Sequence, residues 1–457
     1  MHHEHHTASA EIDTSITEFV HLVTSPLDDP AAHEKALMRA VMKLGAAGMK
    51  HQLEQLAPSE CFVEDGVLWR ETVMSRFDVM TMFGAVKVER PLFRSERNGP
   101  TRCLVKEQAG LVAGFWSQPA AKIAAVAVSE MPMGRAASFL AEAGIVPASR
   151  SSLLRLTGNL HDLWEEHRGE HERIVREAMP IPPQATTVAV SLDGVMVLMS
   201  GSNKATLKAA ARARGKPDKG PAGYREASVA VVCFYDKDGE RLATRRFGRM
   251  PQKDKTDTKD WLRAELKHIR TERPDLVVVA IADGAPNNWS FLEELGADHE
   301  VVDFFHTAVH LHRHVSKANG PSSVETRAKL KEMRRQLLEE SGAADKVFED
   351  MQRGREKAGT AAPPTNSASG KRQPTYFQRH RGRMNYAELR DAKLPIGSGV
   401  TESTCKLTVC DRLRRTGMLW TERGGQGVLT LRAHVVSGSF DPAWKELMSA
   451  NQQRLAA

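Results

Sequence analysis

The sequence predicts an α/β fold, in which a mixed β-sheet core follows a mainly helical region. Two observations lead to this prediction. Three segments with the pattern of strands, the first of them apolar, follow one another between residues 187 and 250, and amphipathic and apolar segments alternate after them. With 457 residues, the chain has room for about three domains, each large enough to bury its own core.

The N-terminal part of the chain is expected to be helical up to about residue 75. Segments such as 32–55 carry apolar residues at the three- and four-residue spacing of an amphipathic helix. The stretch 76–94 is instead rich in Val, Met and Phe around a central Gly84, which predicts two short strands joined by a turn. A second helical region is expected from about 117 to 179.

Within this second helical region, residues 136–156 have the pattern of a helix-turn-helix. Pro147 marks the turn, and a serine at 149 or 151 can cap a second helix that carries Arg150 and Arg155. Such a helix is suited to a DNA major groove. Two helices packed in an ordinary bundle would give the same pattern, so both interpretations stay open.

The central region has the most informative pattern. Strands are expected at 187–199, 227–235 and 241–250, followed by a helix (258–273), a strand (276–282), a helix (288–295), a strand (301–305) and another helix. This βββαβαβα order is that of the RNase H-like fold, in which helices flank a mixed sheet. Residues 322–358 resemble a charged helical insertion, and 360–374 form a Pro-, Ser- and Gly-rich linker that should be mobile.

These elements divide the chain into five expected regions. They are an N-terminal helical region (1–75), a β-hairpin and helix-turn-helix-like DNA-binding region (76–182), the first part of the core (183–320), the helical insertion and linker (321–375), and the final helix of the core with a basic C-terminal region (376–457).

Composition argues against several classes of protein. The longest uninterrupted apolar stretch, 276–282, is far shorter than the ~18 residues of a membrane span, and the N-terminus lacks a secretory signal pattern, so a cytoplasmic location is expected. The five cysteines are far apart and form no C-x-x-C pair, which argues against a disulfide framework and a zinc ribbon. A net charge of +7 modestly favours a polyanionic partner.

Three carboxylates are the candidate catalytic and metal-binding residues. Asp193 interrupts an otherwise apolar strand, Asp283 ends a buried strand, and Glu402 lies on the first turns of a helix that follows a Gly-rich turn. Two Mg²⁺ or Mn²⁺ ions held by such oxygen ligands can activate an attacking oxygen and stabilise a leaving one in phosphodiester chemistry. Each residue alone also has a structural explanation, as a turn or helix-cap acid. Asp303 is a weaker fourth candidate, because a solvated Asp is tolerated at an edge strand.

A cluster of histidines follows Asp303. His306, His310 and His314 are spaced to lie on one face of a helix, with His312 beside them. A zinc site is disfavoured because H-E-x-x-H is absent. We expect His306 and His310 to be accessory residues near a phosphate path, or buried and hydrogen-bonded histidines.

Basic residues are concentrated near Glu402. Residues 379–432 hold eleven Lys and Arg against five Asp and Glu, a distribution that predicts a phosphate-binding track. The expected DNA-binding side chains are Arg379, Arg383, Lys406, Arg412, Arg414 and Arg415, with Trp420 and Tyr386 available to stack on an unpaired base and Arg150 and Arg155 in the helix-turn-helix. A solvated charged face is the alternative for any single arginine.

Four segments together resemble the ISKra-type bacterial insertion-sequence transposases. They are PIGSGVTESTCKLTVCDRLRRTGMLW followed by GGQGVLTLRAHVVSG, S-x-D-G at 191–194, D-G-A at 283–285, and D-F-x-H-x-x-x-H-L at 303–311. They occur in the family's order, and the resemblance covers about residues 75–440.

The resemblance implies a DDE triad of Asp193, Asp283 and Glu402 with two Mg²⁺ or Mn²⁺ ions. It also implies double-stranded DNA partners, namely the terminal inverted repeats of the element and a target, a dimer or higher oligomer at synapsis, and a nucleoid-associated location in a bacterial cell. Of the paired cysteines of the family only Cys103 is present in this chain, so whether an N-terminal zinc site remains stays open. A DNA-binding protein that has lost catalysis and a structure-selective nuclease of the same fold are the alternatives.

Overall fold

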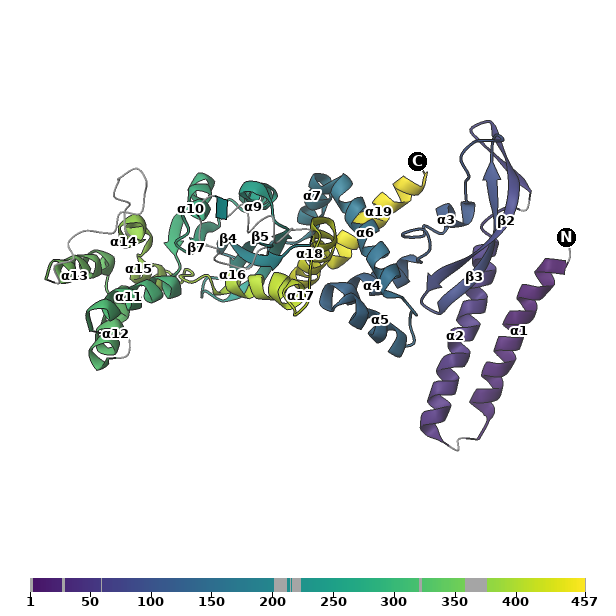
Figure 1. Cartoon of the computed structure of the whole chain (residues 1–457), viewed down its shortest axis with the longest axis horizontal. Coiled ribbons are helices and arrows are strands. Elements are labelled where there is room, and N and C mark those ends of the chain that lie inside the picture. Colours follow the sequence, from purple (N-terminus) through teal and green to yellow (C-terminus); the bar gives the residue numbers. More distant parts are fainter. Residues whose placement is uncertain are drawn as a thin grey trace. The chain divides into compact units, whose positions relative to one another are not determined.

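The computed structural model describes residues 3–26, 29–58, 60–200, 212–213, 215, 223–319, 323–357 and 376–456. They belong to two compact units, one made of 1–175 with 426–457 and the other of 176–425 (Figure 1). The expected boundary at 182/183 lies close to the first division. The expectation that all of 376–457 belongs with the core is wrong, because 426–457 pack in the N-terminal unit. The predicted linker at 360–374 lies outside the described residues.

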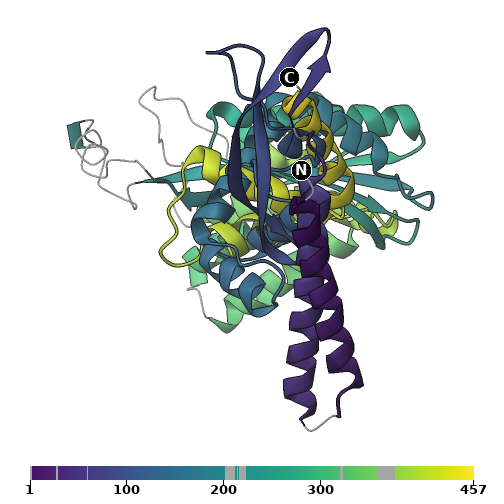
Figure 2. The ribbon, with the colours of Figure 1, turned by 90° about the vertical axis from the view of Figure 1, so that its right-hand side faces the viewer.

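The N-terminal unit begins with a helical hairpin, in which α1 (His3–Thr24) and α2 (Pro30–Glu54) lie side by side (Figure 2). The start of α2 is fixed by local chemistry. The Asp29 side chain accepts hydrogen bonds from the backbone N–H groups of Ala31 and Ala32, and Pro30 occupies the first helical position.

A three-stranded antiparallel sheet follows, made of β1 (Cys61–Glu64), β2 (Val67–Thr81) and β3 (Gly84–Arg94). The β2–β3 hairpin around Gly84 confirms the predicted strand pair. The prediction of helix up to residue 75 is wrong, because Asp65 and Gly66, with φ of 50° and 77°, form a tight turn between β1 and β2. An Asp-Gly pair between β-prone segments is a strong hairpin signal.

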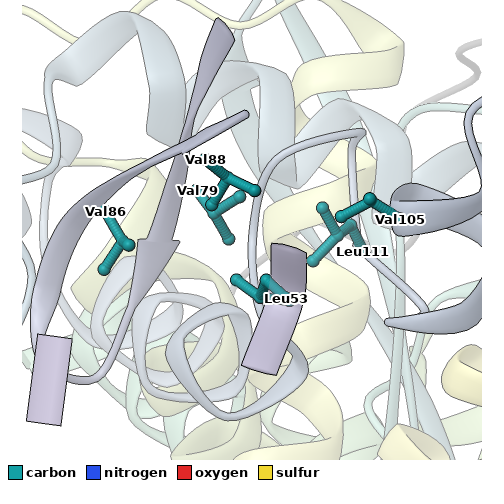
Figure 3. Packing of buried hydrophobic residues seen from close by; sticks show 6 residues of the cluster. All are labelled: Leu53, Val79, Val86, Val88, Val105 and Leu111. Carbon is teal, nitrogen blue, oxygen red and sulfur yellow. The ribbon is translucent and has the colours of Figure 1, made fainter. Parts of the chain in front are cut away.

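The hairpin and the sheet share a hydrophobic core, drawn in Figure 3. Leu53 comes from α2, Val79 from β2, Val86 and Val88 from β3, and two further members from α3 (Leu104–Gln108) and the turn after it. All six side chains are nearly or fully buried. This shared core fixes the C-terminal half of α2 against β3.

The rest of the N-terminal unit is helical. Its helices are α4 (Gln118–Glu130), α5 (Met133–Glu142), α6 (Arg150–Glu166), α7 (Arg168–Ala178), α18 (Glu422–Ser437) and α19 (Phe440–Ala456), of which α7 and α18 run across the divisions between the units. Ser149 caps α6 as predicted, accepting from Ser152 N at 3.1 Å. The connection between α5 and α6 spans 143–149, longer than the three or four residues of a helix-turn-helix turn.

The second unit is built on a five-stranded mixed sheet. Its strands are β4 (Thr187–Leu198), β5 (Tyr224–Tyr235), β6 (Arg241–Arg249), β7 (Val277–Ala282) and β8 (His299–Val302), in the spatial order β6-β5-β4-β7-β8. β5 runs antiparallel to both of its neighbours, β4 and β6, whereas β7 runs parallel to β4 and β8 runs parallel to β7. The predicted sequence of three consecutive strands followed by alternating helices and strands is confirmed.

Helices pack against this sheet and extend from it. They are α9 (Thr256–Glu272), α10 (Pro286–Leu292), α11 (Phe304–Asn319), α12 (Val324–Glu339), α13 (Ala343–Lys357), α14 (Tyr376–His380), α15 (Tyr386–Asp391), α16 (Gly399–Thr404), a π-helix (Cys405–Cys410) and α17 (Asp411–Leu413). α9 contacts β5 and β6, and α16 contacts β4 and β5. Across the described segments, none of the helices is long and apolar enough to cross a membrane.

Candidate functional site

The register of the parallel strands brings three aspartates level with one another. Val190 of β4 pairs with Ala280 of β7, so three residues further along both strands Asp193 lies level with Asp283. Ala282 of β7 pairs with Val302 of β8, so the next position of each strand places Asp283 level with Asp303. The carboxyl ends of parallel strands are where open α/β sheets bind their ligands.

Asp193 is half-buried beside a second carboxylate. Its Oδ1 accepts from Gly194 N at 2.6 Å, and its Oδ2 lies 3.6 Å from the Cys405 thiol. Burial raises the pKa of Asp193, and the nearby charge of Asp283 raises it further. An ionised acid in this position is unfavourable unless a cation compensates it, which is the property expected of a metal ligand.

Asp283 is held by the first turn of α10. Its Oδ1 accepts from Ala285 N at 3.1 Å and from the Asn288 side chain at 3.3 Å. The same Asn288 amide reaches Leu192 O, next to Asp193, at 3.4 Å. Asn288 is buried and connects the two strands that carry the acids, so it helps to keep the Asp283 carboxylate in place.

Asp303 is fully buried, which corrects the expectation of a solvated edge-strand acid. Its carboxylate accepts hydrogen bonds from His306 N at 2.6 Å, from His306 Nδ1 at 3.0 Å and from Ser398 N. Burial alone would raise the pKa of Asp303, but these donors hold it below its ordinary value. The edge is covered because Phe304 N donates to Ile396 O at 3.1 Å, which places the segment before α16 against the end of β8.

His306 lies between Asp303 and Glu402. Its Nδ1 is 3.9 Å from Glu402 Oε1, and the two side chains are 43% and 57% exposed. The hydrogen bond to Asp303 raises the pKa of His306, and the charges of Asp283 and Glu402 contribute in the same direction. The charges of Asp283 and Glu402 both act on the His306 imidazole, and the charge of Asp283 acts on Asp193. The three predicted acids therefore lie in one region.

This convergence is not a closed metal site. Within the described ranges, no three His, Cys, Asp or Glu side chains are grouped closely enough to hold a metal ion. Asp193 and Asp283 lie side by side, whereas Glu402 is more exposed and nearest to His306. The donor chemistry, carboxylate oxygens, suits Mg²⁺ or Mn²⁺, but Glu402 must move toward the aspartates to complete a shared ligand set.

Lys255 is a site residue that the sequence analysis missed. Its Nζ lies 3.2 Å from Glu226 Oε1 and 3.3 Å from Asn288 Oδ1, and its charge lowers the pKa of Asp193. Asp254 and Lys255 both have φ of 56°, an unfavourable conformation for residues other than glycine that is often kept at functional sites. A lysine in a polar turn carries no signal in one sequence, so only the fold reveals it.

Arg412 and Tyr386, two of the residues expected to contact DNA, are buried, so their predicted roles in DNA binding are not supported. Arg412 is 1% exposed, and its guanidinium lies 5.2 Å from the Trp420 ring centre. The Trp420 indole N–H donates to Leu413 O at 2.9 Å. Tyr386 is fully buried, and its hydroxyl donates to Val302 O at 2.8 Å. The basic segment 379–432 thus supplies part of the core of this unit, through the buried side chains of Arg412 and Tyr386.

Arg383 is also occupied within the unit. It makes ion pairs with Glu300 at 2.7 Å and with Glu293, and its guanidinium stacks 4.1 Å above Trp289. Its side chain is mostly buried. Arg383 therefore fastens the segment after α14 to the region of β8, and its predicted role in DNA binding is not supported.

The remaining cations are more accessible. Lys406, Arg414 and Arg415 are exposed on the helical segment that follows Glu402, and Arg379 is half-buried. In the N-terminal unit Arg150 and Arg155 are exposed at the start of α6, with the Arg155 guanidinium 5.1 Å from the Phe115 ring centre. These six side chains are available to the solvent to different degrees and stay candidates for phosphate contacts.

His310 belongs to an aromatic cluster beside Asp283. Its ring stacks on Tyr376 with centres 3.8 Å apart, and Tyr376 also contacts His380. The Tyr376 ring lies directly against Gly284, where a β-carbon would collide with it. Burial lowers the pKa of His310, so this imidazole packs as a neutral ring and helps to close one side of the acidic region.

The site is thus defined by its geometry. Asp193, Asp283 and Asp303 lie level on adjacent strands. Glu402, on α16, lies near His306, and Lys255, in the turn before α9, lies near Asn288. A search of protein-family models and of curated proteins found no match to this chain.

Proposed function

We propose that this chain is a DDE transposase with an RNase H-like core, which cuts DNA and joins strands through divalent metal ions held by Asp193, Asp283 and Glu402. The observation that carries the proposal is the strand register that sets two of these acids level at the centre of a β6-β5-β4-β7-β8 sheet. A mixed five-stranded sheet flanked by helices is compatible with the RNase H-like core that the sequence predicts. The resemblance of residues 395–438 to ISKra-type transposases supports the same function.

The residues of the site would divide the work. Two bound Mg²⁺ or Mn²⁺ ions supply activation of the attacking oxygen and stabilisation of the leaving oxygen. Asp193 and Asp283 offer hard oxygen ligands from a rigid sheet, and Glu402 would join them by rotating its exposed side chain. Lys255 provides a fixed positive charge next to Asp193, suited to a substrate phosphate oxygen.

The proposed substrate is double-stranded DNA, at the ends of the element and at a target. Lys406, Arg414 and Arg415 provide exposed cations on the helical segment that follows Glu402, and Arg150 and Arg155 provide a second exposed pair in the N-terminal unit. Phosphate contacts release counterions, so binding should weaken steeply as salt increases. The proposal places the protein with the nucleoid of a bacterial cell, acting as a dimer or higher oligomer.

The proposal is tested by nicking of supercoiled plasmid DNA in Mn²⁺ or Mg²⁺, followed by assays of strand joining. Asp193→Asn, Asp283→Asn and Glu402→Gln should each lower the cleavage rate by about 100-fold or more, while filter binding of DNA in EDTA stays unchanged. Asp260→Asn, at an exposed acid of α9, is the matched control and should cleave normally. Full activity in any of the first three variants removes that residue from the site.

A second function is favoured by one observation. Since the described acids do not form a closed metal-holding group, a DNA-binding protein that keeps the scaffold without catalysis is the competing proposal. It predicts salt-dependent DNA binding with no metal-dependent nicking and no thermal stabilisation by Mn²⁺. A nuclease of the same fold would nick DNA without joining strands.

A further inference from the structure

Two half-buried cations of the N-terminal unit lie next to each other at the edge of its hydrophobic core. They are Arg90 on β3 and Lys106 on α3. Arg90 Nη1 donates to Cys103 Sγ at 3.3 Å, and Lys106 N donates to Cys103 O at 3.0 Å. Val105 and Leu111, labelled in Figure 3, belong to the core, so the backbone that carries Lys106 is held in place by packing.

The Arg90 guanidinium is positioned without help from an acid. It stacks 3.9 Å from the centre of the Phe77 ring. Its Nε is buried and has no hydrogen-bond partner within the described part of the chain. Among the described residues, no carboxylate forms an ion pair with Arg90 or Lys106. A buried N–H without a partner and a half-buried charge without a counter-ion are both unfavourable, and an anion from another molecule would satisfy both.

The charges of the two side chains repel each other. Burial lowers the pKa of Lys106, and the charge of Arg90 lowers it further. A neighbouring arginine is compensated instead, because Arg102 pairs with Glu64 and, at 2.5 Å, with Glu107, and these acids raise its pKa. The acid that follows Lys106 in the chain thus serves Arg102, and the Arg90–Lys106 pair keeps an excess of positive charge.

A tight turn lies beside this pair. Ala113 and Gly114 have φ of 51° and 81°, and positive values at both central residues are typical of a type I′ turn. The Lys106 ammonium is next to the turn, because a β-carbon on Gly114 would lie 3.6 Å from its Nζ. The Arg155 guanidinium lies 5.1 Å from the ring centre of Phe115, the next residue of the turn. Arg155 is exposed on α6, so a third cation lies close to the same turn.

We propose that Arg90 and Lys106 together bind one phosphate group of the DNA backbone, and that Arg155 contacts a neighbouring phosphate. This inference rests on the DNA substrate proposed above. An arginine presents a planar fork of N–H groups and a lysine presents a compact charge, a combination suited to the oxygens of one phosphate. A DNA strand carries a phosphate at every nucleotide, so it can meet the pair and Arg155 at once. A free phosphate or a small phosphorylated compound would use the pair alone.

The DNA contact is tested on the full chain by fluorescence anisotropy with a duplex of random sequence, in EDTA and at several salt concentrations. Lys106→Gln and Arg90→Gln should each bind about three- to tenfold more weakly at low salt. Each should also reduce the slope of log affinity against log salt concentration by about one, because one phosphate contact is lost. Lys106→Arg keeps the charge and should keep the wild-type slope.

Lys87→Gln is the matched control, because Lys87 is an exposed cation on the opposite face of β3 and should bind DNA as the wild type does. Circular dichroism checks the fold of each variant. Arg90→Gln loses the stacking on Phe77, so Lys106→Gln, at a half-buried residue of a surface helix, decides the result if Arg90→Gln does not fold.

Inorganic phosphate distinguishes the two sources of the anion. It is compared with chloride at equal ionic strength, by hydrogen exchange of peptides that cover 102–116 in the wild type and in Lys106→Gln. Unchanged salt slopes in Lys106→Gln and Arg90→Gln, or an equal loss in Lys87→Gln, would overturn the proposal. Protection by phosphate in the wild type alone, with unchanged slopes, would assign the site to a small phosphorylated compound. A wild type that nicks DNA with these results overturns only this inference, whereas a wild type that does not bind DNA overturns the proposed function as well.

Discussion

The substitution Asp303→Asn removes the charge that joins two elements of the site. In the folded protein, the carboxylate accepts from the amide and the imidazole of His306 at the start of α11, and from the Ser398 amide just before α16. An asparagine keeps one acceptor oxygen and turns an NH₂ group toward a donor. At least one N–H is then left without its partner, and the segment before the helix that carries Glu402 loses its charged hydrogen bond to the end of β8.

The size of the effect follows from these contacts. Hydrogen bonds to a charged group contribute about 1.5–3 kcal/mol each, and Asp303 accepts three of them while fully buried. Loss of one bond and weakening of the others should lower the free energy of unfolding of the second unit by about 3–5 kcal/mol. Asp260→Asn, at an exposed acid, should change it by less than about 0.5 kcal/mol.

Urea unfolding in EDTA, together with hydrogen exchange of peptides that cover 394–404, measures this effect. The lowered pKa of Asp303 means that its stabilisation is complete above about its ordinary 3.8 and is lost as the pH falls through the folded value. The raised pKa of His306 means that its contribution is complete below 6.5 and is lost as the pH rises through its folded value. The difference between wild type and Asp303→Asn should therefore be largest between about pH 4 and 6.5. Equal stability and equal exchange at pH 5.5 would show that Asp303 does not link the two elements.

Three further predictions concern charges of the same unit. In EDTA, Asp193→Asn should raise the free energy of unfolding by about 1 kcal/mol, because it removes a buried charge that Asp283 repels. The same variant should lose stabilisation by Mn²⁺ in a thermal melt. A lower Tm in EDTA would contradict this reasoning. Lys255→Met should tighten Mn²⁺ binding about tenfold in a titration, because the ammonium group that competes with the ion is lost, and it should slow DNA nicking. Lys253→Met, at an exposed lysine, is the control and should have neither effect. Glu265→Gln should lower the free energy of unfolding by about 3–5 kcal/mol in urea, because it leaves the buried guanidinium groups of Arg176 and Arg245 without their 2.8 Å ion pairs; an unchanged midpoint would show that water compensates them.

The central strands could be predicted from the sequence because their signals are local. Asp193 and Asp283 interrupt or end apolar runs, and the alternation of apolar and amphipathic segments predicts the order of strands and helices along the chain. β1 and the first part of β2 were missed for a different reason. The expectation of helix up to residue 75 overlooked Asp65-Gly66, a hairpin signal that the structure uses.

The inward arginines show where sequence reasoning stops. Arg383 and Arg412 look the same in a charge count as Arg414 and Arg415, but the first two are buried in contacts with indole rings. Burial of an arginine depends on the partners that the fold brings from distant segments, such as Glu293 and Glu300 for Arg383. The same holds for Asp303. One of the hydrogen-bond donors that allow its carboxylate to be buried is the backbone amide of Ser398, a residue distant in sequence.

Electrostatics explains why Glu402 remains apart from the two aspartates and leads to a last prediction. Two unit charges about 5 Å apart repel by roughly 3 kcal/mol at an effective dielectric constant near 20, and Asp193 already has a raised pKa beside Asp283. The Glu402 carboxylate can approach the two aspartates only together with a cation. In its observed position it lies instead near His306, whose positive charge partly compensates its own. Glu402→Gln should therefore keep the tighter Mn²⁺ site at the aspartates, within about threefold in a titration followed by electron paramagnetic resonance, while DNA nicking is lost. Loss of all Mn²⁺ binding in this variant would mean that Glu402 is already a ligand of the first ion, and that its distance from the aspartates is not set by repulsion.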